Sequence, residues 1–177
     1  RRRIELHGRV LVVGGGNTAM DCARTALRLG VADVRILYRR TRAQMPAWGE
    51  EVNAADLEGI DILTLVAPEE ILRDADGNVT GVRCREMVLG DYDRSGRRRP
   101  VAGRNPDFVV EADTVIAAIG QKLDAPAILD GTPVELNRWG YLAADPNTGQ
   151  TSVDWVFTGG DAATGPSSVV EAIGAGE

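Results

Sequence analysis

The sequence predicts an α/β fold in which a parallel sheet is followed by an antiparallel meander. Two observations support this prediction. Between residues 10 and 66, short apolar runs alternate with segments of helical periodicity, as they do where crossover helices join parallel strands. Beyond residue 66 the helical periodicity stops, and strand-like segments separated by turn residues continue to about residue 119.

The parallel sheet is expected to begin with the run 10–13, which is wholly apolar, as strands buried on both faces are. A helix should follow over 17–29, where alanines recur at helical spacing. The second strand is expected at 34–38. Pro46 then favours the first position of a second helix, and residues 60–66 form the third expected strand.

The antiparallel part is expected to open with a hairpin of residues 71–73 and 79–89. We expect the Arg-rich segment 91–105 to be a loop, since it contains two glycines and a proline. A further strand is predicted at 108–111. The apolar run 114–119 predicts a strand that returns to the core.

The helical and strand periods weaken beyond residue 121, so we predict one domain over residues 1–120 and a separate segment over 121–177. This segment ends in a helix that runs to Glu177, and a capping box from Ser168 to Glu171 marks its start. Because the first residue is Arg and this helix has no stop signal, we expect the chain to be a piece of a longer polypeptide.

Composition excludes several classes of function. The net charge of −6 argues against a nucleic-acid surface, which needs local basicity. No apolar run approaches the roughly 20 residues that cross a bilayer, and the first residues show no signal-peptide pattern, so we expect none. The two cysteines, Cys22 and Cys84, form no disulfide or metal motif, and we expect a reducing, cytoplasmic setting.

Gly14, Gly16 and Ala19 form the pattern G-x-G-x-x-A between the first expected strand and helix, which is the setting of a Rossmann dinucleotide fingerprint. Gly14 permits the tight turn, Gly16 lets a pyrophosphate approach the backbone, and Ala19 lets the helix pack closely on the sheet. The free amides and dipole of the helix favour the anion. The alternative is a glycine turn in a domain that binds no nucleotide.

The residues that follow the second expected strand predict which nucleotide binds. An NAD site usually carries Asp or Glu there, whereas this strand ends at Tyr38 and is followed by Arg39 and Arg40. Guanidinium groups bind a 2′-phosphate and an acid would repel it, so the sequence favours NADP(H). The alternative is that these arginines belong to a solvated loop.

Several linked motifs resemble the glutamate synthase small-subunit family of FAD-dependent pyridine-nucleotide oxidoreductases. They occur in the family's order at residues 14–24, 38–40, 45–47, 118–121 and 156–161. The resemblance implies that the NADPH pyrophosphate is held by Gly14, Gly16, Asn17, Thr18 and Ala19. It also implies that Arg39 and Arg40 bind the 2′-phosphate.

The same resemblance assigns a second set of cofactor-binding residues: Ile119, Gly120, Gly160, Asp161, Ser168 and Val169. Gly160 and Asp161 match the motif whose carboxylate holds the FAD ribityl chain. Ser168 and Val169 match the start of the helix that points at the flavin, where free amides and the helix dipole would stabilise negative charge.

The chain lacks the family's first flavin half with its glycine fingerprint, its Cys-rich iron–sulfur region and any Cys-x-x-Cys redox pair. We therefore expect residues 121–177 to be the incomplete C-terminal half of a flavin domain. The expected partners are the missing FAD-domain half and iron–sulfur domain of the same polypeptide, with a large catalytic subunit beyond them.

The resemblance implies that the intact enzyme passes hydride from NADPH to FAD and then electrons to iron–sulfur clusters in the missing regions. No catalytic acid, base, nucleophile or metal-ligand set stands out, and hydride transfer between cofactors requires none. The alternatives are a non-catalytic dinucleotide-binding module that regulates a partner and, less favoured, a self-contained dehydrogenase.

Overall fold

The computed structural model describes residues 5–93 and 96–176. The chain divides into two compact units, Arg1–Ile119 and Gly120–Glu177. In the first unit a parallel sheet has the strand order β3-β2-β1-β8. Its elements are β1 (Arg9–Val13), α1 (Asn17–Arg28), β2 (Asp33–Tyr38), the 3-10 turn η1 (Arg42–Gln44), α2 (Gly49–Leu57), β3 (Asp61–Thr64) and β8 (Thr114–Ala117).

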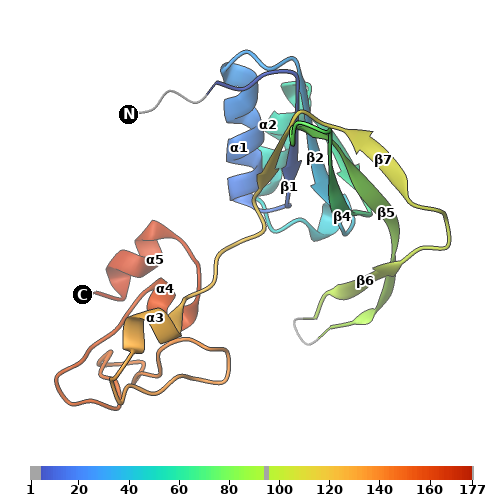
Figure 1. The fold of residues 1–177 in the computed structure, drawn as a ribbon. Coiled ribbons are helices and arrows are strands. Elements are labelled where there is room, and N and C mark those ends of the chain that lie inside the picture. The colour runs from blue at the N-terminus through green and yellow to red at the C-terminus, as the bar shows by residue number, and fades with distance from the viewer. Residues whose placement is uncertain (1–4, 94–95, 177) are drawn as a thin grey trace. The chain divides into compact units, whose positions relative to one another are not determined.

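The parallel sheet is buried on both faces, as its unbroken apolar runs predict. On one face Val12 and Ile36 pack with α1 and α2, where Ala19 and Ala23 allow close approach. On the other face Leu11 and Leu37 join a second core cluster with residues of the antiparallel strands. Figure 1 shows α1 and α2 on one side of the parallel sheet and the antiparallel strands on the other.

The antiparallel strands are β4 (Val66–Arg73), β5 (Val79–Tyr92), β6 (Arg98–Ala102) and β7 (Phe108–Glu111), with β5 pairing to the other three. The predicted third strand is divided at Leu65, whose φ of 56° turns the chain out of the parallel sheet. The predicted hairpin is present and is longer than expected. The mixed α/β fold, with one parallel and one antiparallel sheet, is therefore confirmed.

Two local predictions are wrong. The expected loop 91–105 contains the end of β5 and all of β6, although residues 94 and 95 lie outside the described part. The second helix begins at Gly49 and not at Pro46. The backbone amides of Ala47 and Trp48 instead donate to Gly15 and Asn17 in the first turn, and these contacts delay the helix.

The second unit has little regular structure and few buried residues. It contains α3 (Ala125–Leu129), α4 (Asp161–Thr164), α5 (Val169–Gly174) and three isolated antiparallel bridges. The Ser168 capping box of the last helix is present, and Glu177 lies outside the described residues. Several large apolar side chains are exposed, including Trp155 at 79%, Val170 at 78% and Val169 at 76%.

Within 5–93 and 96–176, every helix is too short or too polar to cross a bilayer.

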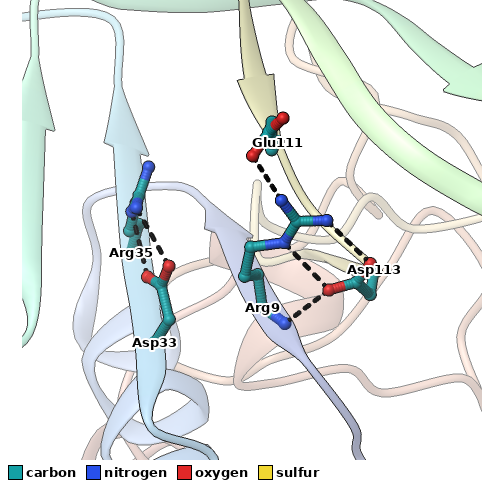
Figure 2. A network of polar contacts seen from close by, with 5 residues as sticks. All are labelled: Arg9, Asp33, Arg35, Glu111 and Asp113. Carbon is teal, nitrogen blue, oxygen red and sulfur yellow. Dashed lines mark hydrogen bonds and ion pairs between the residues drawn. The ribbon is translucent and has the colours of Figure 1, made fainter.

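An ion-pair network joins the N-terminal end of the parallel sheet to the antiparallel strands (Figure 2). The Arg9 backbone amide and Nε donate to Asp113 Oδ2 at 2.7 and 3.0 Å, and its Nη2 donates to Oδ1 at 3.0 Å. Arg9 also pairs with Glu111, which ends β7. Gly8 leaves room for this contact, since a Cβ there would lie 2.2 Å from Asp113 Oδ2.

Asp113 should make the stability of the fold dependent on pH at the acid end. The side-chain hydrogen bond from Arg9 lowers the pKa of Asp113 from 3.8 to about 2. A lowered carboxyl pKa stabilises the folded state above the unfolded value and loses this contribution as pH falls through the folded value. We expect the Asp113→Asn variant to melt below the wild type at neutral pH, and the difference to close between pH 3.8 and about pH 2.

The measurement is thermal melting of both proteins across this range. The control is Asp61→Asn, which removes an exposed carboxylate from the same sheet. A melting difference for Asp113→Asn that stayed constant down to pH 2 would contradict the assignment.

Candidate functional site

The turn between β1 and α1 is built from glycines that cannot be replaced freely. Gly14 has a φ of 144°, and a Cβ there would lie 2.2 Å from the backbone oxygen of Ala118. A Cβ on Gly15 would lie 2.4 Å from the Tyr38 ring. Ala19 is fully buried against the sheet, as predicted for the third position of the fingerprint. The turn thus brings the start of α1 close to the ends of β1, β2 and β8.

Gly16 differs from its two neighbours because none of the described residues requires a glycine there. Its backbone is extended, with φ −91° and ψ 177°, and the nearest atom to an added Cβ would be Pro46 Cγ at 3.9 Å. Gly16 is the N-cap of α1, where no side chain caps the helix and the first turn holds no acidic residue. The amides that precede those of Ala19 and Met20, which donate to the Gly16 oxygen, and the positive end of the dipole are therefore available to an anion.

The two residues after Gly16 have different environments. Thr18 is exposed at the start of α1. Asn17 is half-buried, and its Oδ1 accepts a hydrogen bond from the backbone amide of Trp48 at 2.9 Å. Together with the bond from the Ala47 amide to the Gly15 oxygen at 3.1 Å, this contact ties the turn to the segment before α2. Trp48 is 69% exposed beside it.

The paired arginines after β2 also differ in environment. The Arg39 side chain is exposed at the end of the strand. Arg40 is only 6% exposed, and its guanidinium donates to the Arg98 backbone oxygen at 3.0 Å and to Asp93 Oδ2 at 2.9 Å. Phosphate binding by both residues stays a prediction, but of the two only Arg39 has its guanidinium in solvent.

The remaining predicted residues lie at the end of the first unit and in the second. Ile119 is 75% exposed, and Gly120 has a φ of 92°. Gly160, with a φ of 56°, packs against α5, since a Cβ there would lie 3.1 Å from Ala172 Cβ. The Asp161 carboxylate accepts from the Ser167 amide at 3.1 Å. These contacts keep α4 and α5 together and leave the flavin assignment a prediction.

Ser168 caps α5, and the Glu171 carboxylate accepts from the Ser168 amide at 3.1 Å. The Ser167 hydroxyl, followed by the amide and hydroxyl of Ser168, lowers the pKa of Glu171 to about 2. A fixed negative charge therefore stands near the start of this helix, close to exposed Val169. A flavin contact at Ser168 and Val169 would have to be made beside that charge.

Cys84 is not placed for redox work. Cys84 is buried in the second core cluster, and burial raises the pKa of its thiol to about 11. Cys22 packs against the other cluster, and both thiols are free. In the part of the chain that the structure describes, no group of three or more His, Cys, Asp or Glu side chains could hold a metal ion.

Sequence patterns did not identify three features around the turn. Position 15 must be glycine because a side chain there would overlap the Tyr38 ring. The Asn17 side chain accepts a hydrogen bond from the Trp48 amide. The Arg40 guanidinium is bonded to the β5–β6 hairpin, which is distant in the sequence. Local periodicity carries no information about such contacts. The unusual run of three glycines was the one available indication that Gly15 is constrained.

Comparisons with known proteins agree with this geometry. The family described as pyridine nucleotide-disulphide oxidoreductase matches residues 2–176. The NADP(+)-dependent formate dehydrogenase subunit beta of Moorella thermoacetica is 47% identical over 97% of this chain, which spans 24% of that protein. The glutamate synthase (NADPH) small chain of Azospirillum brasilense is 44% identical over 93% of this chain, which spans 34% of it. The predicted resemblance is confirmed.

The fold has a solved counterpart. The crystal structure of T. acidophilum thioredoxin reductase superposes with a TM-score of 0.75 at 24% identity, covering 95% of this chain and 49% of the other. At this identity the likeness concerns the fold. The chain therefore corresponds to about half the length of that reductase.

Proposed function

This chain belongs to the pyridine nucleotide-disulphide oxidoreductase family, and we propose that it binds NADPH for hydride transfer to FAD in a longer enzyme. The observation that carries the proposal is the start of α1. There an uncapped helix N-terminus without acidic residues meets Gly16, which has space for a ligand and no steric need to be glycine. Backbone amides in this arrangement bind a pyrophosphate.

The preference for NADPH over NADH rests on Arg39. Its exposed guanidinium follows β2 directly, where NAD-binding proteins usually carry an acid. A guanidinium can donate two parallel hydrogen bonds to a phosphate, and it keeps its charge at every physiological pH. The names of the relatives, which include an NADPH-dependent glutamate synthase chain, agree with this choice.

The proposed flavin contribution rests on the second unit. Four of the six predicted residues, Gly160, Asp161, Ser168 and Val169, lie on the neighbouring helices α4 and α5 or at their starts, and this proximity supports the proposal. The exposed apolar residues of this unit fit the expectation that another part of a flavin domain covers them. Bound FAD would supply the hydride acceptor. This chain would help to hold the FAD. Cys84 is buried and the pKa of its thiol is raised, so this thiol is unsuited to disulphide chemistry.

Calorimetric titration of the chain with NADPH and NADH tests the proposal. We expect NADPH to bind at least about tenfold more tightly, because one charge-assisted contact to the 2′-phosphate contributes roughly 1.5–3 kcal/mol. Equal affinities would remove the assignment of Arg39. An absence of binding to either nucleotide would contradict the proposed site as a whole.

A further inference from the structure

Arg40 is the charged side chain that the structure buries most completely among the described residues. Its Nε and Nη2 form one edge of the guanidinium fork, and both are already used by the Arg98 oxygen and the Asp93 carboxylate. Burial of a guanidinium is costly unless it is paired and hydrogen-bonded in this way. The side chain thus joins the end of β2 to the end of β5 and the start of β6.

Asp93 extends this connection into the turn of the β5–β6 hairpin. Its backbone amide donates to the Arg97 oxygen at 2.7 Å, and its Oδ1 accepts from the Arg97 amide at 3.2 Å. The Arg98 guanidinium folds back onto the Leu89 and Gly90 oxygens at 2.8 and 2.9 Å. Arg40 therefore holds a hairpin end that is internally bonded, although this arm extends away from the sheet (Figure 1).

The held hairpin forms one wall of a groove of about 540 Å³. That wall consists of Leu89, Tyr92, Gly96, Arg97 and Arg98, and the other consists of Thr41, Ala43, Gln44, Met45 and Pro46. The second wall is fixed as well, because the Tyr38 hydroxyl donates to the Gln44 oxygen at 2.7 Å. A volume of this size is typical of small-ligand sites, which span roughly 300–1,000 Å³.

The groove adjoins the glycine turn. Pro46 is the nearest side chain to Gly16, and the next residue, Ala47, donates its amide to the Gly15 oxygen. The same wall begins two residues after Arg39. A ligand whose phosphates lie at the start of α1 can therefore extend into this groove.

The lining suits the adenosine end of a dinucleotide. Tyr92 is 73% exposed and offers an aromatic face, while Met45, Pro46 and Leu89 supply apolar contacts for a flat ring. Arg97 and Arg98 make this wall positive, although the Arg98 guanidinium already donates to the Leu89 and Gly90 oxygens. A purine nucleotide has both a flat ring for the apolar surface and phosphate groups for the positive charge.

We propose that the adenosine end of the dinucleotide lies in this groove, against Tyr92, and that Arg40 is a positioning residue that holds the hairpin wall. This inference rests on the proposed NADPH function. It separates the two adjacent arginines, because Arg39 recognises the 2′-phosphate and Arg40 acts through Asp93 on a part of the ligand that NADPH and NADH share.

The test is the affinity of Tyr92→Ala, Arg40→Ala and Asp93→Asn for NADPH, NADH and 5′-AMP. We expect each variant to weaken all three ligands by about 3- to 10-fold and to leave the ratio of NADPH to NADH affinity unchanged. The double variant Arg40→Ala/Asp93→Asn should be no weaker than Arg40→Ala alone, because Arg40→Ala already removes the ion pair that Asp93→Asn changes. The matched control is Arg99→Ala, which removes the same charge from the same hairpin outside the groove lining.

Selective loss of NADPH in Arg40→Ala would make Arg40 a phosphate ligand and overturn the inference. Gain of NADPH affinity in Asp93→Asn would do the same, since it would show a guanidinium released to the ligand. If a variant fails to fold, nuclear magnetic resonance of the wild type with 5′-AMP decides. Shifts at Tyr92 and Gly96 support the groove, and shifts confined to residues 14–19 overturn it. A wild type that binds neither NADPH nor NADH contradicts the proposed function itself.

Discussion

The Gly16→Ala variant is expected to fold like the wild type and to lose most of its affinity for NADPH. The added methyl group would meet Pro46 Cγ at 3.9 Å, which is ordinary contact, and the backbone angles suit alanine. The same methyl group would stand where the phosphates approach the amides of α1. Loss of one or two charge-assisted hydrogen bonds, each roughly 1.5–3 kcal/mol, predicts a weakening of at least about 10-fold.

Gly14→Ala is the matched comparison, because this substitution should lower the stability of the fold itself. A Cβ there would overlap the Ala118 backbone oxygen at 2.2 Å, and the φ of 144° disfavours a side chain. Backbone strain of this kind costs roughly 1–3 kcal/mol, so a fall in melting temperature of about 5–10 °C is expected. Calorimetry and thermal melting of both variants separate the roles. Wild-type affinity in a well-folded Gly16→Ala protein would show that the turn does not hold the pyrophosphate.

The contrast between these two glycines shows what a motif can predict. The pattern of Gly14, Gly16 and Ala19 indicated the turn and the helix behind it, because the alternation of apolar runs and glycines reflects burial close by in the chain. The parallel sheet was predictable for the same reason, since β1 and β2 carry apolar residues on both faces. The motif alone does not distinguish Gly14, which the fold requires, from Gly16, which is proposed to make room for the ligand.

The β5–β6 hairpin could not be predicted in this way. Val88 and Val101 are 46% and 39% exposed, so β6 and the part of β5 that pairs with it, residues 87–92, have no buried face to impose a hydrophobic period. Their order comes from the backbone ladder and from Arg40, whose partner Asp93 is 53 residues away in the sequence. A buried ion pair between such distant residues has no local sequence pattern. The start of α2 was misplaced for a similar reason, because Pro46 follows a local preference that bonds to the glycine turn override.

The Arg39→Ala variant should lose its preference for NADPH over NADH. The guanidinium is the exposed cation that directly follows β2, and the 2′-phosphate is the one group that distinguishes the two nucleotides. Removal of a charge-assisted contact worth roughly 1.5–3 kcal/mol predicts a dissociation constant for NADPH about 10- to 100-fold higher, with NADH almost unchanged. Arg39→Lys should recover part of the loss, because an ammonium supplies the charge without the bidentate geometry.

Titration calorimetry at two salt concentrations measures this effect and its electrostatic origin. The NADPH advantage of the wild type should shrink as salt rises, because Arg39 is exposed and its charge is screened. Arg99→Ala removes an exposed charge of the same type from the hairpin and should leave the ratio of affinities intact. Arg39→Ala proteins that weaken NADPH and NADH equally would mean that the residue supports the site as a whole. The basis for nucleotide choice would then have to lie in another cation near the turn.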